Sequence, residues 1–138
     1  MIRTVRPNID PPYTLHDHNI IELRAEGDRL TLVTQSGMTG TKAPWPQPQG
    51  VIEFHKVDWD FSYAYLLAHT GNFGTFPGEK MSLSEFIRRF PVFGLCAMDE
   101  TFGYNKTFLD GYLTTQRQFY ECFLQIYHEG DMVYLTEE

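Results

Sequence analysis

The chain has few cysteines and no hydrophobic run long enough to cross a bilayer. Two cysteines among 138 residues are too few for a disulfide framework. The longest apolar stretch, residues 92–98, is far shorter than the run of about 18 residues that a membrane helix needs. No apolar stretch follows the charges near the N-terminus, so the sequence predicts no signal peptide. These absences predict a cytoplasmic protein with no membrane partner.

Basic residues are also scarce, and this argues against nucleic acid as a partner. The chain has 11 Lys and Arg against 18 Asp and Glu, a net charge of −7. Proteins that bind nucleic acids draw their affinity from positive surfaces that release phosphate counterions. The acids and bases of residues 1–50 balance, so the excess of negative charge lies in residues 51–138. This acidic part either keeps the protein soluble or docks a basic protein partner.

The rest of the composition is that of an ordinary folded domain. Hydrophobic residues make up 42% of the chain and charged residues 21%, which is far from a disordered composition. A chain of this length can bury one core but has no room for two domains of usual size. We therefore expect a single domain over residues 1–138.

Strand patterns dominate the sequence. Residues 19–25 and 29–35 alternate around a Gly27-Asp28 turn, which predicts a β-hairpin. A second hairpin is predicted over residues 120–126 and 132–136. Residues 51–59, 61–68, 92–98 and 107–114 are further strand candidates, with a turn at 99–105. Within 61–68 the large side chains alternate, so one sheet face should carry Phe61, Tyr63, Tyr65 and Leu67.

One short helix is predicted near residues 82–90. Ser82 and Glu85 have the spacing of a capping box, and apolar residues follow at helical spacing until Pro91. So short a helix needs to pack against a sheet. The predicted fold class is therefore mainly β, a β-rich α+β fold. We expect seven or eight antiparallel strands in a sandwich or flattened barrel with this one helix.

A metal site is one functional hypothesis. His16 and His18 are two residues apart, so on an extended segment their imidazoles would point to the same side. Glu22 would be the third ligand of one divalent transition metal ion. The alternative is that both histidines are hydrogen-bonded structural groups, in which case the protein needs no cofactor.

The spacing His-x-His-x3-Glu resembles the first metal motif of the cupin barrels. Gly71 and Pro77 also reproduce the Gly-x5-Pro opening of the second cupin motif. The resemblance implies a barrel enzyme or sensor with its metal on His16, His18 and Glu22. The chain departs from the pattern after Pro77, where the second motif should supply another histidine.

A different resemblance rests on Leu15-His16-Asp17 and the hairpin that follows. This opening is similar to that of several small uncharacterised bacterial domains, some of which are similar to immunity proteins of polymorphic toxin systems. The likeness covers about the first quarter of the chain. It implies a β-rich, non-catalytic bacterial domain that neutralises a partner by binding it.

Aromatic residues make up 15% of the chain, and some lie in predicted loops. Trp45 lies among three prolines in one irregular segment, and Phe73 and Phe76 lie in another. Exposed rings on semi-rigid loops are favoured anchors for protein partners, although such rings also fold inward as lids on a core. With the acidic Glu121 and Glu129, these rings form the predicted surface for a basic partner.

Two further sets of residues, a pair of acids and the two cysteines, could be catalytic or merely structural. Asp58 and Asp60 would flank Trp59 on one face of an extended chain, where paired acids can cooperate or simply meet water at a strand end. The two cysteines, at positions 96 and 122, lie in apolar patterns and are predicted to be core residues, not nucleophiles.

Three function classes follow from these residues. The first is a non-catalytic binding protein, the second a metal-dependent enzyme or sensor, and the third a small-ligand binder lined by Phe61, Tyr63 and Tyr65. An exposed edge strand would also allow a homo-oligomer.

Overall fold

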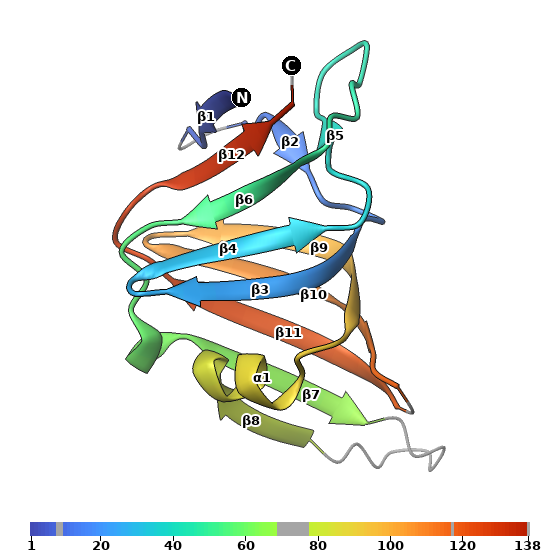
Figure 1. Ribbon diagram of the computed structural model, residues 1–138, viewed down its shortest axis with the longest axis vertical. Coiled ribbons are helices and arrows are strands. Elements are labelled where there is room, and N and C mark those ends of the chain that lie inside the picture. Colours follow the sequence, from blue (N-terminus) through green and yellow to red (C-terminus); the bar gives the residue numbers. More distant parts are fainter. Residues whose placement is uncertain (8–9, 69–77, 117, 138) are drawn as a thin grey trace.

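The computed structural model describes residues 1–7, 10–68, 78–116 and 118–137, which form twelve strands, one α-helix and one 3-10 turn (Figure 1). The elements are β1 Ile2–Val5, β2 Tyr13–Thr14, β3 Asn19–Glu26, β4 Arg29–Thr34, β5 Thr39–Gly40, β6 Gly50–Phe54, η1 Trp59–Phe61, β7 Tyr63–Ala68, β8 Gly78–Ser82, α1 Leu83–Arg89, β9 Gly94–Gly103, β10 Lys106–Thr114, β11 Phe119–Tyr127 and β12 Met132–Thr136. The mainly β fold with one short helix is confirmed. The twelve strands exceed the predicted seven or eight because β1, β2, β5 and β8 lie outside the segments that the sequence patterns marked as strands.

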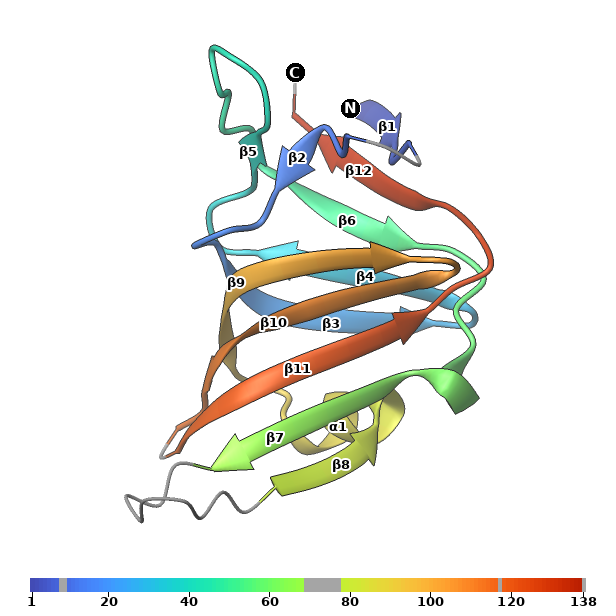
Figure 2. The same ribbon diagram turned by 180° about the vertical axis from the view of Figure 1, so that it is seen from behind.

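Ten of these strands form one antiparallel sheet in the order β1-β12-β6-β4-β3-β9-β10-β11-β7-β8. The link between β3 and β9 is short, with only Asn19 and Ile20 paired to β9. Figures 1 and 2 show the strands from β1 to β3 facing the strands from β9 to β8 across the interior. The edge strands β1 and β8 do not pair with each other, so the sheet is not closed into the flattened barrel that we considered.

Apolar side chains from both halves of the sheet fill the interior. Fully buried examples are Leu32, Ile52, Leu95, Leu109 and Leu124. The pair β2 and β5 lies at the upper end of this interior in Figure 1, and α1 lies at the lower end.

Helix α1 closes the lower end of the core. Ser82 Oγ accepts a hydrogen bond from Glu85 N at 3.1 Å, which confirms the predicted helix cap. Phe86 is fully buried and its ring lies 5.1 Å from the ring of Phe90 and 5.5 Å from that of Phe93. No helix in the described ranges has the length and apolarity to cross a bilayer.

The first predicted hairpin is confirmed and the second is wrong. β3 pairs with β4 around Gly27, whose φ of +61° suits the tight turn. β11 and β12 exist as strands, but β11 pairs with β10 and β7 while β12 pairs with β6 and β1. The residues between them carry the chain from one half of the sheet to the other. They are held by neighbouring turns, since Gly130 N donates to His55 O at 3.0 Å.

Two predicted boundaries also need correction. The turn expected at 99–105 is confined to residues 104–105, because β9 continues to Gly103. The strand expected over 51–59 ends at Phe54 and is followed by η1.

Candidate functional site

The outer side of the second half of the sheet is rich in aromatic residues. In β7, Ala64 and Leu66 point into the core and are buried, so Tyr63, Tyr65 and Leu67 lie on the outer side. The prediction of one shared sheet face is confirmed for Tyr63, Tyr65 and Leu67, whereas Phe61 lies in η1, before the strand begins. That face is turned away from the core, since Ala64 and Leu66 are the residues that pack inside.

The aromatic rings form a row across three neighbouring strands. Ring centroids lie 5.3 Å apart between Phe108 and Phe123, 5.6 Å between Phe123 and Tyr65, and 6.4 Å between Tyr65 and Tyr63. Lys80 Nζ lies 4.1 Å from the Tyr63 centroid and 5.6 Å from the Tyr65 centroid. These distances are within the range of cation–π contacts, so this row already accepts one ammonium group.

A second pair of rings extends the surface toward β3. Tyr112 and Phe119 stack with centroids 5.6 Å apart and an interplanar angle of 15°. Their exposed fractions are 43% and 53%. They border a groove of about 630 Å³ that Ile21 and Cys96 also line. Rings therefore occur on the outer side of the sheet in two groups, one from β7 to β10 and one at the groove beside β3.

Carboxylates lie between the rings. The strand register places Asp110 opposite Phe123 on one side and opposite Asp99 on the other, and it places Glu121 opposite Tyr112. Burial raises the pKa of Asp110, and the negative charges of Glu121 and Asp99 raise it further. Mutual repulsion of this kind would be relieved by a cation brought to the surface from outside.

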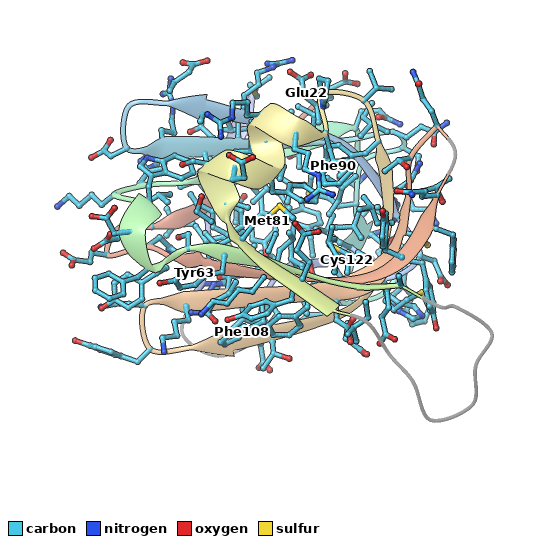
Figure 3. All side chains as sticks on the ribbon, turned by 90° about the horizontal axis from the view of Figure 1, so that it is seen from below. Glu22, Tyr63, Met81, Phe90, Phe108 and Cys122 are labelled. Atoms are coloured by element: carbon cyan, nitrogen blue, oxygen red, sulfur yellow. The ribbon has the colours of Figure 1, made fainter. Side chains whose placement is uncertain are left out.

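No helix or strand of the described chain covers this surface. In Figure 2 the strands β9, β10, β11 and β7 lie in front, and α1 lies behind them. Figure 3, from below, shows Met81 in the interior near the helix and Tyr63 and Phe108 on the outer side of the sheet. We call this surface the aromatic-acidic face and define it by the residues Tyr63, Tyr65, Asp99, Phe108, Asp110, Tyr112, Phe119, Glu121 and Phe123.

Sequence reasoning missed several residues of the face, namely Phe108, Asp110, Tyr112, Phe119 and Phe123. The signal was present in the two-residue alternation of β10 and β11, where Leu109 and Leu124 point inward. The alternation alone does not tell which strands are neighbours, and the row of rings exists only through the register of β10, β11 and β7.

The segment of the predicted metal ligands is a turn, not the extended strand that we expected. His18 N donates to Leu15 O at 2.8 Å, and Asp17 has a φ of +65°. The argument that His16 and His18 point to the same side holds only for extended backbone, so this expectation is wrong.

The three predicted metal ligands have separate partners. His16 Nδ1 donates to Met98 O at 2.6 Å, and the two ring nitrogens of His18 lie 3.2 and 2.7 Å from hydroxyl groups. Glu22 pairs with Arg24, the Oε2 to Nε distance being 2.7 Å. The structure does not bring these side chains together, and the described residues contain no group of three His, Cys, Asp or Glu placed to hold a metal ion.

The predicted binding residues lie in different parts of the molecule. Trp45 is 62% exposed on the loop between β5 and β6, which projects from the top of Figure 1. Glu121 belongs to the aromatic-acidic face, whereas Glu129 follows the far end of β11. Phe73 and Phe76 lie outside the described residues. Of this set, the face therefore contains Glu121.

The 3-10 turn η1 begins at Trp59 directly after Asp58, so the expected extended arrangement of Asp58 and Asp60 is wrong. Asp58 Oδ1 accepts from Asp60 N at 3.1 Å, and Trp59 Nε1 donates to Gly27 O at 2.8 Å. Asp58 therefore caps the turn, and Trp59 ties it to the β3–β4 hairpin.

The two cysteines differ in position. Cys122 is buried in the core, as predicted, and burial raises the pKa of its thiol to about 12. Cys96 is half-buried on the outer side of the sheet, so its prediction as a core residue is wrong. Tyr63 and Tyr65 lie on the outer side of β7, and Phe61 lies in η1 and is 57% exposed, so the structure does not place these rings between the two halves of the sheet.

Comparison of the chain with protein-family models, with curated proteins and with solved structures finds no match in any of the three. The functional conclusions below therefore rest on the chemistry and geometry of the chain itself.

Proposed function

We propose that this protein is a non-catalytic binding domain that docks a basic protein partner on its aromatic-acidic face. The observation that carries this proposal is the alternation of rings and carboxylates on one uncovered side of the sheet. Aromatic residues are enriched in the energetically important parts of protein interfaces. Exposed apolar patches mark interaction sites, and here Asp110 and Glu121 lie between two groups of rings on the outer side of the sheet.

The acidic residues argue for a basic partner. The chain carries a net charge of −7, and Asp99, Asp110 and Glu121 place three carboxylates on the face, against the one ammonium group of Lys80 over its Tyr63 end. Complementary charge raises the rate of association and disfavours partners of like charge. A second copy of this chain would bring the same carboxylates against each other, so self-association through this face is disfavoured.

Lys80 illustrates how a partner's basic side chain would bind. Its ammonium group lies over the ring of Tyr63 at one end of the row of rings. At the other end, Phe108 and Phe123 present rings beside the Asp110 carboxylate. A lysine or arginine of the partner would stack on these rings and pair with Asp110, gaining both a cation–π contact and an ion pair.

A binding role of this kind agrees with what the resemblance to immunity proteins implies. Such a domain acts by covering part of its partner and needs no metal or nucleophile. The proposal thus extends the predicted role of Glu121 to the rings around it and does not use His16, His18 or Glu22.

The test compares charge reversals inside and outside the face. The partner is captured on the immobilised wild-type protein, identified, purified, and its affinity measured at low and high salt. Asp110→Lys should weaken binding at least tenfold, about 1.4 kcal/mol, because the partner's cation then meets a like charge. Glu129→Lys changes the net charge equally outside the face and should leave affinity within about twofold, well under that energy. Equal effects of the two variants, or an acidic partner, would overturn the proposal.

A further inference from the structure

A second candidate site lies at another part of the fold, where the β9–β10 turn meets the connection between β11 and β12. A cleft of about 560 Å³ is lined here by Arg6, Phe102, Tyr104, Asn105 and His128, with Glu129 and Asp131 also on its wall. Arg6 follows β1, and its backbone N donates to Met132 O at 2.8 Å, which fixes the arginine beside the cleft.

The guanidinium of Arg6 has no acceptor among the described residues. Its Nε atom is buried without a hydrogen-bond partner, and its Cζ lies 4.5 Å from the Phe102 ring centroid. The more exposed Arg24 and Arg29 both pair with glutamates, at 2.7 and 2.9 Å. The Arg6 guanidinium thus carries a positive charge without a carboxylate partner among the described residues. Because Nε is buried, the other guanidinium nitrogens are the donors that an anion in the cleft can meet.

His128, which also lines the cleft, is neutral and fixed. Gly130 O can only accept, so His128 Nδ1 donates to it at 2.9 Å and Nε2 accepts from Thr107 Oγ1 at 2.8 Å. Both ring nitrogens of His128 are therefore occupied, and its ring also packs edge-on against Phe54. Among the residues that line the cleft, Arg6 thus supplies the positive charge.

We propose that this cleft binds a small organic monocarboxylate, whose two oxygens accept hydrogen bonds from the Arg6 guanidinium. The planar fork of donors matches a carboxylate in a bidentate arrangement. Glu129 and Asp131 on the wall repel a dianion such as phosphate more than a single negative charge. Tyr104, which is 90% exposed at the β9–β10 turn, offers a ring for the apolar part of the ligand.

The test is an NMR titration of the isotope-labelled full chain with benzoate, and with benzamide as a neutral ligand of the same shape. Benzoate should shift the Arg6 Nε–Hε signal and the backbone amides of Gly103, Asn105 and Gly130. Benzamide should bind at least tenfold more weakly. Arg6→Gln should abolish the benzoate shifts, whereas Arg3→Gln, the same change at an exposed position of β1, should keep them.

Several results of these titrations would contradict a carboxylate site at Arg6. Equal binding of benzoate and benzamide, or binding of inorganic phosphate as tight as that of benzoate, would overturn the proposal. So would benzoate shifts that persist in Arg6→Gln or that gather at Arg3. The comparison of the two ligands uses the wild-type protein, so it decides the matter even where Arg6→Gln does not fold.

Discussion

If the rings of the aromatic-acidic face serve binding and not core packing, truncating one of them should lower the free energy of unfolding only slightly. Phe123 is the ring at the centre of the row, half-buried on the outer side of β11. Phe86 is the matched ring inside the core, fully buried on α1. Phe123→Ala removes a phenyl ring from the outer side of the sheet, and Phe86→Ala removes the same ring from the core.

The structure sets the expected size of each effect. Phe123 loses two ring contacts, at 5.3 and 5.6 Å, and cross-strand aromatic pairs contribute about 0.5 to 1 kcal/mol each. The expected loss in the free energy of unfolding is therefore about 1 to 2 kcal/mol. Phe86→Ala leaves a cavity among buried neighbours and should cost about 3 to 5 kcal/mol.

Urea denaturation of both variants and the wild type measures these losses directly. A loss of 3 kcal/mol or more for Phe123→Ala, equal to that for Phe86→Ala, would place the outer rings in the structural core. The reasoning that assigns them to binding would then fail.

Three further predictions test other parts of the structure. A thiol reagent should label the half-buried Cys96 of the native protein and reach Cys122, with its pKa of about 12, only on unfolding; equal labelling rates in a mass-spectrometric time course would contradict this. Ser82→Ala should lower the free energy of unfolding by about 1 kcal/mol through loss of the α1 cap, and Ser82→Asp should restore it in thermal melts. Burial lowers the pKa of His128 below 6.5, so the unfolded chain takes up a proton that the native chain does not; stability should fall as the pH drops below about 6.5, and an unchanged slope in His128→Gln would refute the assignment.

Local signals predicted the fold well where the structure depends on neighbouring residues. The β3–β4 hairpin follows from the turn at Gly27, and α1 follows from Ser82 and the apolar spacing after it. The second hairpin failed because alternation in β11 and β12 is the same whether the two strands pair with each other or with distant ones. Their partners are β10, β7, β6 and β1. This pairing depends on where the sheet passes from one half to the other, which is at β3 and β9.

The candidate site was predictable only in part for the same reason. Alternation put Tyr63 and Tyr65 on one face, but it did not tell that Ala64 and Leu66 would be the buried side and that the tyrosine face would be the outer one. The structure does not bring the side chains of His16, His18 and Glu22 together, because Asp17 adopts a left-handed conformation that turns the chain. Arg6 gave no signal in the sequence, since its lack of a partner is a property of the surrounding fold.

The most direct test of the proposed binding face is hydroxyl-radical footprinting of the protein alone and with its purified partner. Tyr112, Phe119 and Trp45 are exposed to similar extents, 43%, 53% and 62%, so each reports on its own surface. Our account predicts that the partner strongly reduces oxidation of Tyr112 and Phe119 and leaves that of Trp45 unchanged. Protection of Trp45 with no change at Tyr112 and Phe119 would contradict it and place the partner on the loop between β5 and β6.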